Sequence, residues 1–224
     1  MMNYVLAIAA AAVISYLLGS CNSSIIVVRL LKGEDVRSKG SGNAGLTNTL
    51  RCYGKGCALL TLIGDLGKGV VAVLLSRLIC KMLEAGLTPD NDTHYIGYIA
   101  GLFAILGHVF PLYYGFKGGK GVLVGVSIFI VVNPVVFAIL IGIFAIVLIL
   151  SKYVSLSSII ASAMCPVLTI PVGLYINQVS LERSLLYAVL SIPMAAMVIW
   201  MHRSNIQRLK DGCENKFSFK SSGK

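Results

Sequence analysis

Residues 107–121, which read GHVFPLYYGFKGGKG, hold a histidine, two lysines and five glycines between two apolar runs. Glycine lets a ligand approach backbone N–H groups closely and the lysines add positive charge, so the pattern indicates a phosphate-binding loop. The alternative is a flexible, positively charged turn between membrane helices. The residues assigned to phosphate binding here are Lys117, Gly118, Gly119, Lys120 and Gly121.

A second polar stretch, residues 38–51, reads SKGSGNAGLTNTLR. Backbone N–H groups freed by glycines, a hydroxyl and a bidentate guanidinium would together hold a phosphate. The alternative is a surface loop followed by a helix that Thr47 or Asn48 caps. That alternative accounts for one or two of the polar residues but not for their density. The candidate ligands in this stretch are Ser41, Gly42, Asn43, Thr47, Asn48 and Arg51.

A third polar stretch, residues 202–214, reads HRSNIQRLKDGCE. His202, Asn205 and Arg208 are spaced to share one face of a helix. The alternative is a basic anchor on acidic lipid.

An ionisable pair also lies inside an apolar run, where Asp65 and Lys68 are spaced to share a helical face. Such a pair costs several kcal/mol in hydrocarbon unless it faces protein or water. It is either a mutually neutralising structural pair or part of a binding site.

The composition is that of an integral membrane protein. Of 224 residues, 57% are hydrophobic and only 12% are charged, with a mean hydropathy of +0.85, whereas a soluble domain is about 25% charged. The net charge of +10 is therefore read as the excess of Lys and Arg in cytoplasmic loops. We predict membrane lipid, and no nucleic acid, as a partner.

No metal or disulfide is expected. The six cysteines form no CxxC pair, and the three polar stretches contain only two carboxylates, Asp211 and Glu214. The apolar N-terminal run is read as a retained first helix, because no Lys or Arg precedes it and many spans follow.

Apolar runs predict an all-α polytopic membrane protein, with a single domain over 1–224 and a flexible tail at 211–224. A proline disfavours helical conformation at the residue before it, so the chain at Asn133-Pro134 forms either a kink in one helix or a turn between two. A turn gives about seven spans, with the N-terminus outside and the basic C-terminus cytoplasmic. This orientation agrees with the rule that Lys and Arg are in excess on the cytoplasmic side. The expected spans are 3–31, 56–80, 95–110, 122–132, 134–150, 159–176 and 184–201.

Several common active-site patterns are absent from the sequence. Residues 115–121 lack the spacing of a P-loop, no His is followed five residues later by Asp, and no Gly-x-Ser-x-Gly elbow with a plausible triad occurs. What remains is two phosphate-binding stretches and no obvious protein nucleophile.

The chain resembles the bacterial glycerol-3-phosphate acyltransferases that use acyl phosphate as donor, the PlsY family. The resemblance runs through the whole chain in order. It departs at Leu46, at Leu123-Val124 and at Cys21-Asn22, and the first two departures are small packing changes beside the site. The matching blocks are 41–51, 107–111, 116–122, 155–158 and 202–214.

This resemblance implies transfer of a fatty acyl group from acyl phosphate to the sn-1 hydroxyl of glycerol 3-phosphate. The products would be 1-acyl-glycerol 3-phosphate (lysophosphatidic acid) and phosphate, in the first step of phospholipid synthesis. The protein would be a monomer without cofactor in a bacterial plasma membrane, with its active site facing the cytoplasm.

The resemblance also implies roles for residues of all the polar stretches. Ser41, Asn43 and Arg51 would bind one phosphate, and the 117–121 stretch the other phosphate or the oxyanion. The proton of the glycerol hydroxyl would go to His108 or to glycerol 3-phosphate itself. The expected catalytic residues are Ser41, Arg51, His108, Lys120 and Asn205. Further substrate-binding candidates are Asp65, Lys68, Ser155, His202, Arg208 and Glu214.

A membrane transporter of a small phosphorylated anion is the alternative function. It would place polar residues near the bilayer midplane and pair broken helices in two repeat halves. The polar stretches instead lie at the ends of apolar runs, and no internal repeat is found.

Overall fold

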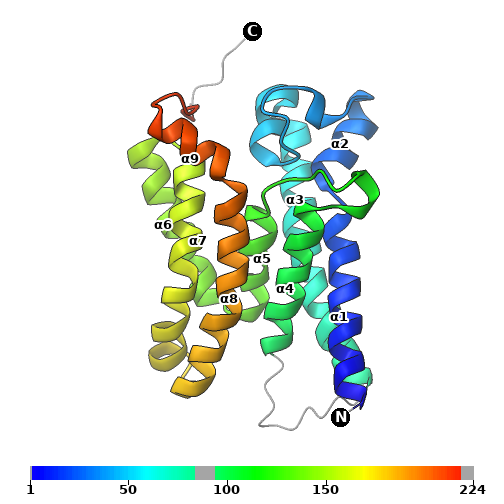
Figure 1. Cartoon of the computed structure of the whole chain (residues 1–224), viewed down its shortest axis with the longest axis vertical. Helices are drawn as coiled ribbons and strands as arrows, with labels where there is room; N and C mark the ends of the chain where they lie inside the picture. The colour runs from blue at the N-terminus through cyan, green and yellow to red at the C-terminus, as the bar shows by residue number, and fades with distance from the viewer. Residues whose placement is uncertain (1, 84–93, 218–224) are drawn as a thin grey trace. The chain divides into compact units, whose positions relative to one another are not determined.

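The computed structural model describes residues 2–83 and 94–217, and every regular element in those ranges is helical (Figure 1). The chain divides into two compact units, unit 1 (Met1–Pro134) and unit 2 (Val135–Lys224). The elements are α1 (Met2–Ser20), α2 (Ser23–Lys32), η1 (Val36–Ser38), α3 (Leu46–Met82), α4 (His94–Val109), η2 (Leu112–Tyr114), α5 (Val122–Val132), α6 (Pro134–Ser151), α7 (Val154–Pro171), η3 (Val172–Ile176), α8 (Leu181–Met201) and α9 (Arg203–Lys210).

Six helical segments in the described ranges are long and apolar enough to cross a membrane, which confirms an all-α polytopic membrane protein. The remaining apolar helix, α5, has 11 residues, or about 16 Å at 1.5 Å per residue. The predicted count of seven consists of these six and α5. The orientation of the termini stays a prediction. The six segments are Asn3–Lys32, Leu46–Met82, Tyr95–Tyr114, Pro134–Ser151, Val154–Ile176 and Leu181–Met201.

The chain does break at Asn133-Pro134. Helix α5 ends at Val132, and Asn133 leaves the helical region with φ −155° and ψ 86°. Helix α6 then begins at Pro134, where a proline is favoured because the first residues of a helix need no N–H donor. The structure therefore has two helices here instead of one kinked helix.

Two helices begin earlier than the apolar runs predict. Helix α3 starts at Leu46, and Gly54 interrupts it with φ 83°, so the predicted span from residue 56 is its second part. Helix α7 starts at Val154 instead of residue 159. The hydroxyls of Ser157 and Ser158 there donate to carbonyls four residues back, so polar residues are accommodated within helix.

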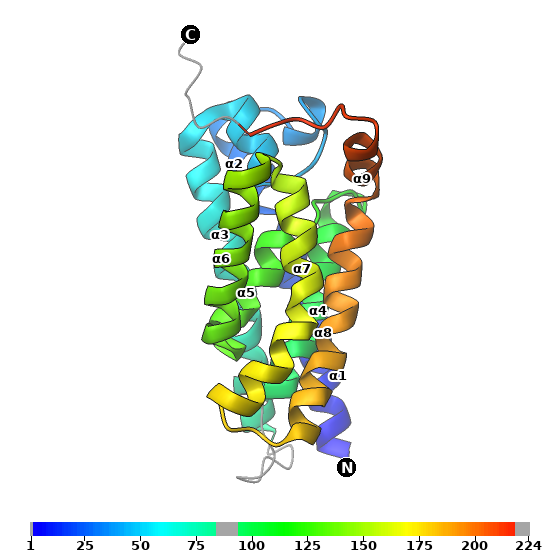
Figure 2. The same ribbon diagram turned by 90° about the vertical axis from the view of Figure 1, so that its left-hand side faces the viewer.

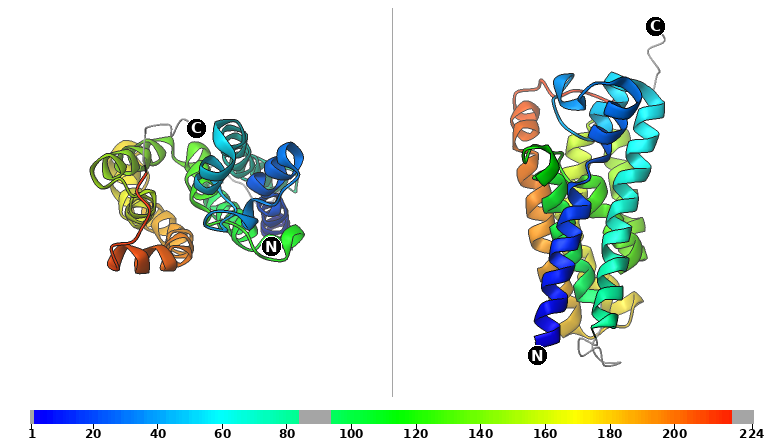
Figure 3. Two further views of the ribbon diagram at one scale, coloured as in Figure 1. Left: turned by 90° about the horizontal axis from the view of Figure 1, so that it is seen from above. Right: turned by 90° about the vertical axis from the view of Figure 1, so that its right-hand side faces the viewer.

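Glycines allow the helices of unit 1 to pack closely. Helix α1 packs against α3 and α4 (Figure 3). A Cβ on Gly19 would meet the backbone of Ala104, and a Cβ on Gly107 would meet the carbonyl of Tyr16. Small residues are the usual means by which membrane helices approach each other. This packing positions the end of α4, which carries His108.

The junction between α1 and α2 is held by Asn22. Its side-chain Oδ1 accepts from the backbone N–H of Ile25 at 3.2 Å and from the Ser24 hydroxyl at 2.7 Å, which caps the N-terminus of α2. Its Nδ2 donates to the carbonyl of Ala44 at 3.3 Å. The departure from the family pattern at residues 21–22 therefore supplies a capping side chain that also ties the junction to the 38–51 stretch.

In unit 2, α7 packs against α8, and α9 contacts both (Figure 2). The chain after α9 returns to the start of α7, where the N–H of Phe217 donates to the carbonyl of Lys152 at 2.6 Å. Of the tail predicted to be flexible, residues 211–217 are described and 218–224 lie outside the described residues.

Candidate active site

A buried cluster of three ionisable side chains lies in unit 1. Lys68 Nζ is 2.9 Å from Asp65 Oδ1 and 2.9 Å from His108 Nδ1, and it donates to the carbonyl of Cys21 at 3.1 Å. Asp65 is 1% exposed, Lys68 9% and His108 3%. The ionisable pair noted in the sequence therefore faces protein, and it contacts the candidate catalytic histidine.

Residues 115–121, here called the glycine–lysine loop, are packed on this histidine. The N–H groups of Gly118 and Gly119 donate to the carbonyls of Val109 and His108, each at 3.1 Å. These two N–H groups are thus used to hold the loop, whereas the sequence suggested that they were open to phosphate. A Cβ on Gly119 would meet both His108 Nε2 and the carbonyl of Ala44, so only glycine fits there.

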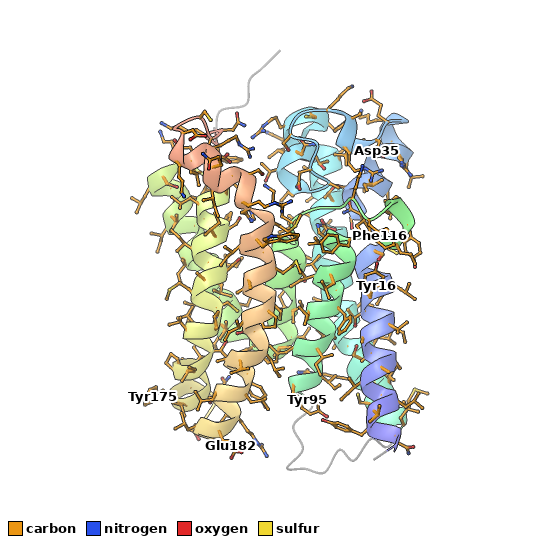
Figure 4. All side chains as sticks on the ribbon, viewed as in Figure 1. Tyr16, Asp35, Tyr95, Phe116, Tyr175 and Glu182 are labelled. Carbon is orange, nitrogen blue, oxygen red and sulfur yellow. The ribbon has the colours of Figure 1, made fainter. Side chains whose placement is uncertain are left out.

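The side chain of Arg37 clamps the glycine–lysine loop from the other side. Its Nη1 donates to the carbonyls of Tyr114 at 2.8 Å and Lys117 at 2.9 Å. Asp35 holds the same guanidinium at Nε (2.9 Å) and Nη2 (2.8 Å), and the Arg37 hydrogen bonds keep the pKa of Asp35 far below its ordinary value. Figure 4 shows Asp35 and Phe116 at the same end of unit 1.

The 38–51 stretch is shaped around the side chain of Asn48. Its Oδ1 accepts from the Ser41 N–H at 2.9 Å and the Ser41 hydroxyl at 3.2 Å, and its Nδ2 donates to the carbonyls of Val36 and Lys39, each at 3.0 Å. A primary amide has two N–H donors, and both are used. The predicted phosphate ligand Asn48 is therefore occupied in holding the loop, and it does not cap α3, whose N-cap is Gly45.

Other predicted ligands of this stretch face outward. Ser41, Gly42 and Arg51 are exposed, and Asn43 and Thr47 are half-buried. Within the described part of the chain, Arg51 makes no hydrogen bond or ion pair. It lies near the N-terminus of α3, where backbone N–H groups lack intrahelical partners and the helix dipole is positive.

The lysines of the glycine–lysine loop add charge at this end of unit 1. Lys117 is exposed and Lys120 is half-buried. The loop meets the 38–51 stretch where Gly119 approaches Ala44. Two basic segments far apart in the sequence are therefore neighbours, as an anion-binding site requires.

Unit 2 contains a second polar cluster, centred on Glu214. Its Oε1 accepts from Ser155 Oγ at 2.9 Å and Asn205 Nδ2 at 2.7 Å, and its Oε2 accepts from Arg208 Nε at 2.7 Å. His202 is buried, and its Nδ1 hydrogen-bonds the carbonyl of Val198 at 2.7 Å. Asn205 and Arg208 therefore both meet Glu214 from α9, and four of the five predicted site residues of this region are joined by hydrogen bonds. His202 lies just before α9, and its ring bonds to α8 instead.

Glu214→Gln is expected to remove a pH-dependent part of the stability. Burial alone would raise the pKa of Glu214, but hydrogen bonds from Asn205, Arg208 and Ser155 outweigh it and hold the pKa below its ordinary 4.5. The ionised group therefore stabilises the fold above about pH 4.5, and this contribution is lost as pH falls through the lower folded-state pKa.

Thermal unfolding in detergent, followed by circular dichroism from about pH 7 to about pH 3, measures this effect. The variant should lose about 2 kcal/mol near neutral pH, and its Tm should then change less on acidification than that of the wild type. Equal acid sensitivity of the two proteins would contradict the assignment.

Within the described ranges, no group of three or more His, Cys, Asp or Glu side chains could hold a metal ion. The six cysteines are free thiols.

The chain matches known proteins over nearly its whole length. The family model for glycerol-3-phosphate acyltransferase matches residues 9–212. Proteins named glycerol-3-phosphate acyltransferase are 38% identical in Clostridioides difficile (strain 630), with 93% of this chain and 95% of the relative covered, and 41% identical in Synechococcus sp. (strain CC9902), with 92% and 94% covered.

Solved structures of PlsY, described as an integral membrane glycerol 3-phosphate acyltransferase, have the same fold. The glycerol 3-phosphate form aligns with a TM-score of 0.77 and 30% identity, over 94% of this chain and 96% of that chain. The lysophosphatidic acid form aligns with a TM-score of 0.75 and 28% identity, over 94% and 95%. This chain therefore belongs to the glycerol-3-phosphate acyltransferase family, as a multi-pass bacterial membrane protein of the PlsY type.

Proposed function

We propose that this protein transfers a fatty acyl group from acyl phosphate to the sn-1 hydroxyl of glycerol 3-phosphate, producing lysophosphatidic acid and phosphate. Family membership supports the acyltransferase activity and the acceptor. Beyond this, we propose the acyl-phosphate donor and transfer to the sn-1 position. We also propose that the site faces the cytoplasm and acts in the first step of phospholipid synthesis.

One observation carries most of this proposal. The glycine–lysine loop meets the 38–51 stretch at Gly119 and Ala44, and the meeting point is beside the buried His108. Arg51, Lys117 and the N-terminus of α3 then supply positive charge and N–H donors at one end of unit 1. Two phosphorylated substrates need such a surface, because their charges would otherwise repel each other.

The reaction needs alignment more than a protein nucleophile. Acyl phosphate is an activated mixed anhydride, so the glycerol hydroxyl oxygen can attack the acyl carbonyl carbon directly. The bond from that carbon to the phosphate oxygen breaks, and phosphate leaves with the electron pair. The hydroxyl proton passes to His108 or to a substrate phosphate. Holding the reactants in register and stabilising the developing oxyanion then account for the catalysis.

The proposed roles of residues follow from their positions. Ser41, Gly42, Asn43, Thr47 and Arg51 are candidate ligands of one phosphate. Lys117, Lys120 and the loop N–H groups other than those of Gly118 and Gly119 are candidate ligands of the other phosphate or of the oxyanion. Asn48 is a positioning residue, because its amide holds the 38–51 stretch. In unit 2 the candidate substrate-binding residues are Ser155, His202, Asn205, Arg208 and Glu214, with Asn205 also a candidate catalytic residue.

The test is a parallel donor assay. Purified protein with labelled glycerol 3-phosphate is offered acyl phosphate, acyl-CoA or an acyl carrier protein thioester. We expect labelled lysophosphatidic acid with acyl phosphate alone. Product with either thioester would contradict the proposed donor. Product with none of them, together with uptake of labelled glycerol 3-phosphate into proteoliposomes, would favour a transporter instead.

A further inference from the structure

We propose that Arg37 is a positioning residue for acyl transfer: its guanidinium holds the glycine–lysine loop in one conformation and so orients the side chain of Lys117 toward the phosphate that it binds. In this role Arg37 itself touches neither substrate. The inference rests on the proposed function for the identity of the substrates, and it deepens that function by assigning a role to a residue outside the predicted site.

The guanidinium of Arg37 has little capacity left for a ligand. A guanidinium carries five N–H groups. Two of them, on Nε and Nη2, donate to the two carboxylate oxygens of Asp35 at 2.9 and 2.8 Å. Both N–H groups of Nη1 donate to the loop, to the carbonyls of Tyr114 at 2.8 Å and Lys117 at 2.9 Å. One N–H group remains, whereas a bidentate phosphate contact needs two, so Arg37 is not such a phosphate ligand.

The backbone between the two bound carbonyls has an unfavourable conformation. Gly115 and Phe116 are both left-handed there, with φ of 65° and 58°. Glycine adopts this region readily, but phenylalanine stays in it only where the surrounding structure holds it. Arg37 binds a carbonyl on each side of this turn. Loss of its guanidinium would therefore let Phe116 relax and would reorient the next residue, the exposed Lys117.

A second arginine on the same carboxylate provides a matched control. Arg29 Nη2 donates to Asp35 Oδ2 at 2.8 Å. Its guanidinium lies 5.3 Å from the centre of the Tyr114 ring, but among the described residues it donates to no loop carbonyl. The Arg29 side chain is 49% exposed and that of Arg37 is 23% exposed, and an ion pair of such an exposed side chain contributes little to stability. The two arginines share charge and partner, and only Arg37 hydrogen-bonds to the loop.

Hydrogen exchange in detergent measures the order of the loop without substrates. In Arg37→Ala we expect peptides from residues 112–121 to exchange at least about 10-fold faster, because a charge-assisted restraint on the loop is lost. Peptides from α7 in that variant, and the loop in Arg29→Ala, should exchange as in the wild type. Unchanged loop exchange in Arg37→Ala would overturn the inference. The N–H groups that report on the loop through their bonds to backbone carbonyls are those of Tyr114, Phe116, Gly118 and Gly119.

A double-mutant cycle tests whether Arg37 acts through Lys117. Initial rates are measured with acyl phosphate and glycerol 3-phosphate each varied. We expect Lys117→Ala and Arg37→Ala to raise KM for the same one of the two substrates, each by about 10-fold or more. The double variant should be at most about twofold worse than the more impaired single variant, since coupled residues are not additive. Multiplication of the two losses, or wild-type kinetics in Lys117→Ala, would overturn the inference.

Two further variants keep the test decisive if Arg37→Ala does not fold. Arg37→Lys retains the charge, but an ammonium has three hydrogens and cannot replace the four hydrogen bonds to Asp35 and the loop. The same increase in KM is therefore expected. Phe116→Asn added to Arg37→Lys should recover at least about threefold of the loss, because asparagine adopts the left-handed region more readily. Full activity in Arg37→Lys would overturn the inference.

Failure of the proposed function would give a different result. Hydrogen exchange is measured without turnover, so the restraint of the loop by Arg37 is tested by itself. If the wild-type protein forms no product with any acyl donor, the proposed function fails while the exchange result is unaffected.

Discussion

Gly119→Ala is expected to lower kcat/KM for acyl transfer by about 100-fold or more. A Cβ at this position would meet His108 Nε2 and the carbonyl of Ala44. One contact is to a buried ring and the other to backbone, so neither can move without shifting the loop. The methyl group would therefore separate the two basic segments and displace the imidazole ring of His108.

Initial rates with acyl phosphate and glycerol 3-phosphate measure this effect. Gly142→Ala is the matched control, because a Cβ on Gly142 in α6 has no neighbour within 4 Å. The control should keep wild-type activity. Gly119→Ala with wild-type kinetics would show that close approach at this glycine is not required.

Arg51→Ala is expected to lower kcat/KM for glycerol 3-phosphate by about 100-fold, with little change in Tm. The guanidinium is exposed and pairs with no other described residue, so its removal leaves the fold intact. A bidentate contact between guanidinium and phosphate is charge-assisted, and its loss typically costs a few kcal/mol, or about two powers of ten in rate.

The matched control for this variant is Lys55→Ala. Lys55 is also exposed, but it follows the interruption of α3 at Gly54 and has no assigned role. Comparing KM and Tm of the two variants separates loss of one particular ligand from loss of general positive charge. If Lys55→Ala and Arg51→Ala reduce activity equally, the specific assignment of Arg51 is wrong.

Most of the fold could be predicted because the length of an apolar run indicates whether it can cross the membrane as a helix. The ends of α4, α5, α6 and α8 lie within three residues of the apolar runs that predicted them. The first turns of α3 and α7 were missed, because their polar residues are satisfied by helix geometry and local hydroxyl bonds. Polarity signals the end of an apolar span, but it does not signal the end of a helix.

The candidate site could be predicted only where its signal is local. The spacing of Asp65 and Lys68 predicts a shared face, and the structure confirms the pair. Their third partner, His108, comes from another helix, so no spacing in the sequence reveals the contact. Arg37 was not among the predicted site residues, yet it clamps the glycine–lysine loop. Such roles depend on packing and are invisible in a single sequence.

The central claim is that the 38–51 stretch and the glycine–lysine loop form one phosphate-binding surface on the cytoplasmic side. Single cysteines at Lys39, Phe116 and Asn177, placed in an active cysteine-free variant, test it with a membrane-impermeant maleimide. All three positions are exposed. We predict that Lys39→Cys and Phe116→Cys react in inside-out vesicles only, and Asn177→Cys in spheroplasts only. Labelling of Lys39→Cys and Phe116→Cys from opposite sides of the membrane, or of both from the outside, would contradict the account.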